Sequence, residues 1–296
     1  MKNVLIIGGS GLLGSNWAMK WRDRYNIFLG INKRFTLIKG TKSIIIDFNN
    51  EKRIKDIIEK NKIDILVNCS GLTSVEKCEI DLALAEDTHC DLSKVLSKLC
   101  SSLAIKQIHI STDHLSDGSK KFVKEDDLTK PLNIYGKTKL KAEKLVAKFD
   151  PNALIIRTNF FGNGPNYRRS FSDYIIDKIT KNKSVDLFSD FFFTPIHINE
   201  LIEIAEKLLL NNLSGIYNVV GNERLTKYEF GLKIASEMGI KTELIKKSFL
   251  SERTDLVKRP FDLSLSNKKL KNSISISIKT LNQQIKDMLN VNMQKI

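Results

Sequence analysis

Short runs of apolar and β-branched residues alternate with longer stretches in which apolar residues recur at helical spacing, up to about residue 158. The apolar runs predict strands at Val4–Ile7, Ile27–Ile31, Ile44–Phe48, Ile65–Asn68, Gln107–Ser111 and Leu154–Thr158. Helical patterns lie between them, for example over Arg53–Lys60 and Leu92–Leu99. Because the strands are apolar throughout, they are expected to be buried on both faces. The alternation therefore predicts an α/β fold with a doubly wound parallel sheet.

The alternation loosens after residue 158. The segment FFGNGPNYRRS predicts a loop, and the segments after it predict a helix at Phe171–Lys181, a strand near Asp186–Phe188, a helix at Asn199–Leu210 and a strand at GIYNVVG. Thr226 and Glu229 then have the spacing of a capping box that begins another helix. We expect a first domain of residues 1–158 plus about 194–220, and a smaller, discontinuous α/β domain of about 159–193 and 221–296.

Composition narrows the classes of function. The chain has 296 residues, 42% of them hydrophobic, which is enough for substantial cores. Lys and Arg number 48 against 34 Asp and Glu, a formal charge of +14 that invites comparison with nucleic-acid-binding proteins. The cations are interspersed with acids and form no long run of one sign. We therefore expect no nucleic-acid partner, and a basic surface that attracts an anionic small molecule.

The cysteines and the N-terminus give no sign of secretion. Cys69, Cys78, Cys90 and Cys100 form no C-x-x-C motif and have no His at zinc-ligand spacing, which predicts reduced thiols and no metal site. The apolar run after Met1 is too short for a signal peptide, and no stretch has the length of a membrane span. The expected location is cytoplasmic, without a membrane partner.

A glycine loop follows the first predicted strand. It reads Gly8-Gly9-Ser10-Gly11-Leu12-Leu13-Gly14 and leads into a helical pattern. Glycines allow a tight turn and a close approach of the backbone to a pyrophosphate, and the helix N-terminus supplies free N–H groups. The strand–loop–helix context predicts a dinucleotide-binding domain of Rossmann type.

The end of the second predicted strand bears on the choice of cofactor. NAD-binding proteins often have a carboxylate there, whereas this chain has Asn32-Lys33-Arg34. Cations at this position can pair with a 2′-phosphate, which favours NADP(H) and leaves NAD(H) as an alternative. The competing interpretation is that Lys33 and Arg34 only face water. Asp47-Phe48 and Ser70-Gly71, after the third and fourth strands, are expected to flank the adenine and to let the cofactor lie against the backbone.

The segment PLNIYGKTKLKAEK contains the candidate chemistry. Tyr135 and Lys139 are four residues apart, so they share one face of a helix, and the fifth strand ends in Ser111-Thr112-Asp113. Carbonyl reduction leaves an oxyanion that needs a proton, and a tyrosine can give it. A nearby ammonium would lower the tyrosine pKa, and the Thr112 hydroxyl would orient the substrate oxygen. The other lysines of this segment are expected to be solvated.

These motifs resemble the dTDP-4-dehydrorhamnose reductase family, within the extended short-chain dehydrogenases/reductases of the NAD-dependent epimerase/dehydratase superfamily. The matching segments run in the family's order through nearly the whole chain: GGSGLLG, VNCSGLTSVEKCE, HISTDHLSDG, PLNIYGKTKLKAE, IIRTNFFG, GIYNVVGNERLTKYE and RPFDLSLSNKKL. The resemblance implies NADP(H)-dependent reduction of a nucleotide-linked 4-keto-6-deoxy sugar. It also implies that the smaller domain binds this substrate.

The resemblance assigns roles by position. The catalytic set would be Thr112, Tyr135 and Lys139. The cofactor would be lined by Gly8, Gly11, Leu12, Leu13, Gly14, Asn32, Lys33, Arg34, Asp47, Phe48, Ser70, Gly71, Tyr135 and Lys139. The substrate side would hold Thr73, Val75, Asp113, His114, Asn159, Phe160 and Arg259, the last as a clamp for a diphosphate.

Some positions depart from the family pattern, and alternatives remain. His114 stands where an aromatic Tyr is usual, Phe160 where Trp is frequent and Asn159 where Ser is common. Because Asp113 is followed by His114 and not by Glu, a dehydratase is disfavoured. The NERLTKYE segment also resembles the NADP-binding regulatory subunit of methionine adenosyltransferase, so a non-catalytic binding protein stays open. A sugar nucleotide epimerase is a further alternative, and a homodimer is the expected assembly.

Overall fold

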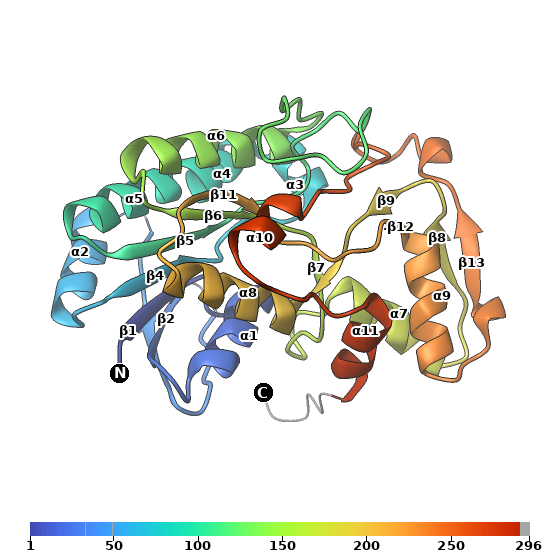
Figure 1. Cartoon of the computed structure of the whole chain (residues 1–296), viewed down its shortest axis with the longest axis horizontal. Helices are drawn as coiled ribbons and strands as arrows, with labels where there is room; N and C mark the ends of the chain where they lie inside the picture. Colours follow the sequence, from blue (N-terminus) through green and yellow to red (C-terminus); the bar gives the residue numbers. More distant parts are fainter. Residues whose placement is uncertain (33, 49, 291–296) are drawn as a thin grey trace.

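A parallel sheet of seven strands organises the chain (Figure 1). The computed structural model describes residues 1–32, 34–48 and 50–290. In spatial order the strands are β11 (Gly215–Asn218), β6 (Leu154–Arg157), β5 (Lys106–Ile110), β4 (Ile65–Asn68), β1 (Asn3–Ile7), β2 (Asn26–Ile31) and β3 (Thr41–Ile45). The order reverses between β1 and β4, which is the switch point where ligands of such sheets bind. The predicted doubly wound Rossmann sheet is confirmed.

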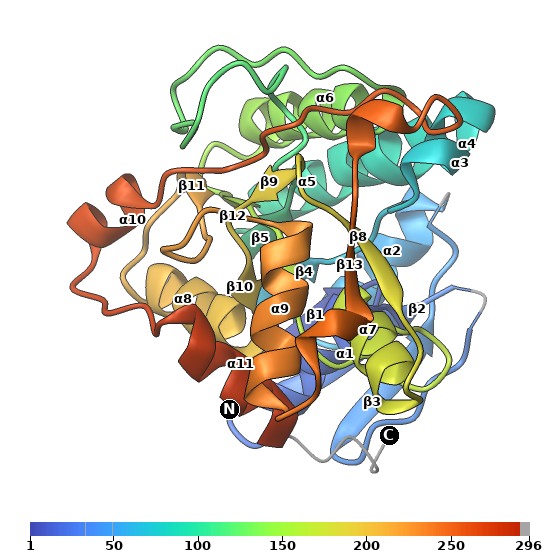
Figure 2. The same ribbon diagram turned by 90° about the vertical axis from the view of Figure 1, so that its right-hand side faces the viewer.

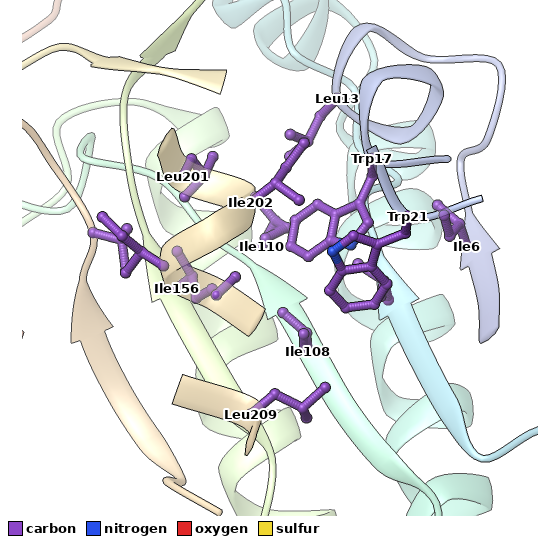
Figure 3. Packing of buried hydrophobic residues seen from close by; sticks show 14 of the residues in the cluster. Ile6, Leu13, Trp17, Trp21, Ile108, Ile110, Ile156, Leu201, Ile202 and Leu209 are labelled. Atoms are coloured by element: carbon purple, nitrogen blue, oxygen red, sulfur yellow. The ribbon is translucent and has the colours of Figure 1, made fainter. Parts of the chain in front are cut away.

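Helices cover both faces of the sheet because its strands are apolar on both sides. One face packs against α1 (Leu12–Trp21) and α8 (Ile198–Leu210), and the other against α2 (Glu51–Lys60), α5 (Leu92–Ser102) and α6 (Ile134–Phe149). Figure 3 shows Trp17 and Trp21 of α1 packed with Ile202 of α8 and Ile110 of β5. Both tryptophans are fully buried, with ring centroids 5.4 Å apart in an edge-to-face arrangement.

A second, smaller core lies beside the carboxyl ends of the strands. It is formed by α7 (Phe171–Thr180), α9 (Lys227–Glu237), α11 (Leu281–Asn290) and the parallel pair β8 (Val185–Phe188) and β13 (Ile245–Ser248). Figure 2 brings α7, α9, β8 and β13 to the front, with the main sheet behind them. Phe193 and Phe230 are the largest fully buried side chains of this core. The division into domains at the expected residues stays a prediction.

The remaining elements are short. They are the helices α3 (Val75–Ile80), α4 (Leu82–Glu86) and α10 (Lys268–Ser273), a π-helical turn (Asp87–Asp91), two 3₁₀ turns (Thr242–Leu244 and Leu250–Glu252), and the two-residue strands β7 (Phe160–Phe161), β9 (Phe192–Phe193), β10 (Ile196–His197) and β12 (Leu225–Thr226). Within the described residues, none of the helices combines the length and apolar character needed to cross a membrane.

Most element boundaries agree with the prediction to within a few residues. The capping box of Thr226 and Glu229 is present at the start of α9 and is confirmed. The third strand is the main correction, because it was expected at Ile44–Phe48 and lies at Thr41–Ile45. It is an edge strand, so its position follows from pairing with β2, in which Ile31 is opposite Ile45. The expected loop FFGNGPNYRRS begins with the strand β7.

A buried ion pair fastens α6 to the sheet. Arg157 of β6 donates from Nε to Oε1 of Glu143 at 3.0 Å and from Nη2 to Oε2 at 2.8 Å. Both side chains are buried, with exposed fractions of 4% and 2%. Arg157 also donates to the carbonyl of Glu125, so three segments meet at one guanidinium. A buried pair of this kind depends on both partners, because either charge alone would be left uncompensated.

Removing one partner of this pair should therefore cost more than removing both. We expect Glu143→Leu to lower the free energy of unfolding by about 3–5 kcal/mol, since Arg157 would remain buried without its carboxylate. In the double variant Glu143→Leu/Arg157→Met, the free energy of unfolding should fall by much less, because no buried charge is left unpaired. Urea unfolding of the two variants and the parent protein measures the difference. A single variant no less stable than the double one would contradict this account.

Burial keeps the histidines of the core neutral. Desolvation lowers the pKa of His89 to about 3 and that of His197 to about 4, and it lowers the pKa of His109 well below its ordinary value. All three side chains are buried. Below the ordinary histidine pKa the unfolded chain therefore binds more protons than the folded chain, and stability must fall as the pH falls.

His197 allows this effect to be isolated, because its ring packs against Phe161 with centroids 5.5 Å apart. His197→Phe keeps an aromatic ring and removes one titrating group. Between pH 6 and pH 5, the free energy of unfolding should fall less steeply in the variant, by about 1.4 kcal/mol per pH unit. Urea unfolding at several pH values checks this slope. Parallel pH profiles of variant and parent would show that His197 does not titrate as stated.

Candidate active site

A cavity of about 910 Å³ opens at the carboxyl edge of the sheet, between the two cores. The predicted residues that line it are Gly8, Gly11, Leu12, Leu13, Asn32, Arg34, Phe48, Ser70, Gly71, Thr73, Tyr135, Lys139 and Phe160. Its other lining residues include Ser10, Thr88, His89, Tyr167, Arg168 and Phe171, none of which was predicted from the sequence. The structure thus brings most of the expected cofactor residues and two of the three expected catalytic residues to one cavity.

The glycine loop is packed tightly enough to require its glycines. Gly8 has φ +79°, and a Cβ atom there would lie 2.9 Å from the backbone nitrogen of Ser70. Gly14 does not line the cavity, yet a Cβ atom on it would lie 2.4 Å from the carbonyl oxygen of Gly8. Helix α1 begins directly after Gly11, which caps it without a side chain, so free N–H groups face the cavity wall. This geometry fits a pyrophosphate.

The end of β2 presents one described cation to the cavity. Arg34 lines the cavity, and its guanidinium carbon lies 4.7 Å from the ring centroid of Tyr167. Lys33, the other expected cation, lies outside the described residues. Asp47 and Phe48 were expected at the end of the third strand but lie beyond it, since β3 ends at Ile45. Phe48 lines the cavity and Asp47 does not.

Thr112, Tyr135 and Lys139 meet where β5 ends. Helix α6 approaches this point closely because Gly136 leaves room, and a Cβ atom there would lie 2.3 Å from the carbonyl oxygen of His114. Asn133 caps the helix by accepting from the N–H of Gly136 at 2.9 Å. The Thr112 side chain is close enough to the Tyr135 phenol to lower its pKa. The glycine directly after Tyr135 is therefore the sequence signal for this close approach.

The electrostatics of this group differ from the expectation. We expected the Lys139 ammonium to lower the tyrosine pKa. In the structure, burial raises the pKa of Tyr135 above its ordinary value, the Thr112 side chain opposes that rise, and Lys139 is not among the causes. Lys139 instead donates from Nζ to the carbonyl oxygen of Ile110 at 2.6 Å. Burial lowers the pKa of Lys139 to about 8, with Glu143 acting in the opposite direction.

Two histidine rings flank Tyr135. The ring centroid of His89 lies 5.8 Å and that of His114 5.4 Å from the Tyr135 centroid, both edge to face. Nε2 of His89 accepts from the N–H of Leu72 at 3.0 Å, so the neutral ring carries its proton on Nδ1 and donates it to Thr138 at 2.8 Å. His89 sits in the π-helical turn, a local register change that periodicity in the sequence does not reveal.

The expected substrate residues gather beside this group, mostly outside the cavity lining. Asp113 is buried, accepts a hydrogen bond from Asn159, and has Oδ1 4.0 Å from Nε2 of His114. Burial lowers the pKa of His114, and Asp113 opposes this effect. Arg259 is paired with Glu76 and donates to the carbonyl of Val257 at 3.2 Å. Val75 is buried at the start of α3.

Lys227 is a charged residue near these side chains that the sequence did not identify. Its Nζ lies 3.4 Å from the ring centroid of Phe193, 4.9 Å from that of Phe171 and 5.5 Å from that of Phe191. Desolvation lowers the pKa of Lys227 to about 7, and Asp113 opposes the change. Phe171 also lines the cavity, so Lys227 stands just behind its wall. In the sequence it was one lysine among many.

The chain is similar to known proteins along nearly its whole length. The family described as RmlD substrate binding domain matches residues 1–293. A probable low-salt glycan biosynthesis reductase from Haloferax volcanii is 25% identical over 286 residues, covering 95% of each chain. The dTDP-4-dehydrorhamnose reductase of Aggregatibacter actinomycetemcomitans is 26% identical over 290 residues, covering 93% of this chain and 94% of its own.

Two further comparisons concern the alternatives and the fold. Methionine adenosyltransferase 2 subunit beta from Bos taurus is 27% identical over 248 residues, covering 81% of this chain and 73% of its own. The crystal structure of dTDP-4-dehydrorhamnose reductase from Bacillus anthracis in complex with NADP superposes with a TM-score of 0.88 at 21% identity, over 98% and 99% of the two chains. At that identity the likeness shows the fold. The chain therefore belongs to the RmlD substrate binding domain family, the NAD(P)-dependent dTDP-4-dehydrorhamnose reductase family that its motifs predict.

Proposed function

We propose that this protein reduces the keto group of a nucleotide-linked 4-keto-6-deoxy sugar with NADPH. The observation that carries the proposal is the meeting of Tyr135, Thr112 and Lys139 at the end of β5, beside a cavity lined by the glycine loop. Acid–base groups next to a dinucleotide site are what carbonyl reduction requires. The family and its named reductases give the substrate class.

Each member of the group has a distinct task. When bound, the nicotinamide supplies hydride to the keto carbon. Tyr135 gives its proton to the oxygen, and its raised pKa keeps the phenol protonated until then. Thr112 orients the phenol and the substrate oxygen through its hydroxyl. Lys139 holds α6 to the end of β5 by donating from Nζ to the carbonyl oxygen of Ile110, which fixes the position of Tyr135 one turn earlier.

The preference for NADP(H) rests on the end of β2. Arg34 lines the cavity where the ribose of a dinucleotide binds in this fold, and a guanidinium can hold a phosphate with two parallel hydrogen bonds. A carboxylate, which would accept from the 2′-hydroxyl of NAD, is absent from Asn32-Lys33-Arg34. The expected homodimer and cytoplasmic location remain predictions.

A regulatory, non-catalytic role is the second candidate. The resemblance to methionine adenosyltransferase 2 subunit beta, at 27% identity, is what favours it. Such a protein would bind NADP(H) through the same cavity without turnover. NADPH oxidation assayed with a panel of nucleotide 4-keto sugars separates the two candidates. Tight NADPH binding without reduction of any panel member would favour the regulatory role.

Tyr135→Phe tests the proton donor, because it removes only the hydroxyl. We expect kcat for sugar reduction to fall about 10²–10⁴-fold, while NADPH binding stays near the parent value. Single-turnover kinetics with the best sugar of the panel, together with fluorescence titration of NADPH, gives both quantities. Equal turnover by the variant and the parent protein would rule out Tyr135 as the acid.

Lys139 and Lys137 form a matched pair for a second test. Lys139 is 4% exposed, whereas Lys137 faces solvent on the same helix. Lys139→Met should reduce kcat at least as strongly as a typical acid–base variant, by about 10²-fold or more, since it removes the buried ammonium. Lys137→Met should have almost no effect. Circular dichroism melting of both variants separates lost chemistry from lost folding. Similar activities for the two variants would contradict the assignment.

A further inference from the structure

The loop that follows β7 crosses back over the glycine loop. Asn163 accepts at its carbonyl oxygen from Asn16 of α1 at 3.0 Å, and a Cβ atom on Gly164 would lie 3.1 Å from Leu12. Arg168 donates to the Thr73 hydroxyl at 3.3 Å across the cavity. Residues 163–168 therefore form a strap over the cofactor cavity, supplied by the part of the chain expected to bind the substrate.

Tyr167 is the point where this strap touches the nucleotide side. Its hydroxyl donates to the carbonyl oxygen of Ser10 in the glycine loop, 3.1 Å away. The same oxygen lies 3.1 Å from the Thr36 hydroxyl. Because a phenol has one proton, which goes to Ser10, the second hydrogen bond must be donated by Thr36. The two bonds fix the phenol between the glycine loop and the segment after β2.

The Tyr167 ring in turn restricts Arg34. The guanidinium carbon lies over the ring, 4.7 Å from its centroid, at a distance typical of a cation–π contact. Arg34 is otherwise a solvent-exposed side chain with many accessible rotamers. The cation–π contact holds Arg34 beside the cavity, where a guanidinium can donate to a phosphate.

We propose that Tyr167 is a positioning residue for cofactor choice, which pre-orients Arg34 to bind the 2′-phosphate of NADP(H). This inference rests on the proposed NADP(H) preference. It assigns part of that preference to a residue of the strap, which is separate in sequence from the glycine loop and from the end of β2. Pre-orientation lowers the entropic cost of ordering Arg34 when the ligand binds. Its loss should therefore weaken the binding of ligands that carry the 2′-phosphate and leave the binding of ligands without it unchanged.

The test uses two fragments that differ only in the 2′-phosphate. Isothermal titration calorimetry gives Kd for 2′,5′-ADP and for 5′-AMP with the full-length protein and its variants. Tyr167→Ala should raise the Kd for 2′,5′-ADP by about three- to tenfold and leave the Kd for 5′-AMP within about twofold of the parent value. Tyr167→Phe keeps the ring and should have a smaller effect. Tyr174→Ala, which removes an exposed tyrosine of α7, is the matched control and should change neither Kd.

A double-mutant cycle with Arg34→Ala shows whether Tyr167 acts through Arg34. If it does, the double variant should bind 2′,5′-ADP no more weakly than Arg34→Ala alone. Equal weakening of both fragments by Tyr167→Ala, or additive losses in the double variant, would overturn the proposal. If Arg34→Ala lost selectivity and Tyr167→Ala kept it, only this inference would fail. If Arg34→Ala itself kept selectivity, the proposed cofactor preference at Arg34 would fail as well.

Discussion

The attachment of α6 to the sheet is the constraint on which the site depends. The ion pair between Glu143 and Arg157 fixes the helix to β6, and Lys139 fixes it to β5 through the carbonyl of Ile110. Tyr135 lies one turn before Lys139, so its position follows from these two attachments. Because both attachments are buried, solvent does not screen them, and Tyr135 keeps a defined position in the cavity wall.

Burial also determines the charge state of the site. Tyr135 remains protonated and His89 and His114 remain neutral because desolvation opposes the charged form of each. Lys139 and Lys227 are cations whose pKa values are lowered for the same reason. Desolvation of this region strengthens the electrostatic interactions that its charged groups make with a bound ligand.

Local sequence patterns were sufficient to predict the sheet and the glycine loop. Strands buried on both faces require apolar residues, and tight backbone turns require glycine, so both features are visible in the residue types. They also placed Tyr135 and Lys139 on one face of α6. They misplaced β3, whose position depends on pairing with β2. His89, Tyr167 and Lys227 were missed because each reaches the site through tertiary packing, which the spacing of residues along the sequence does not reveal. The hydrogen bond from Lys139 Nζ to the carbonyl oxygen of Ile110 could likewise not be predicted from the spacing of residues in the sequence.

The π-helical turn at Asp87–Asp91 interrupts an otherwise continuous helix from Leu82 to Ser102. Such a turn contains one residue more than an α-helix would use over the same rise, and helices acquire it by a single-residue insertion. The wider turn takes up the extra residue, so the α-helical segments on either side can keep their register. His89 lies inside this turn and packs against Tyr135, so the turn is what places an imidazole beside the phenol. Length variation in this helix is therefore a means of altering the site without substituting any residue in it.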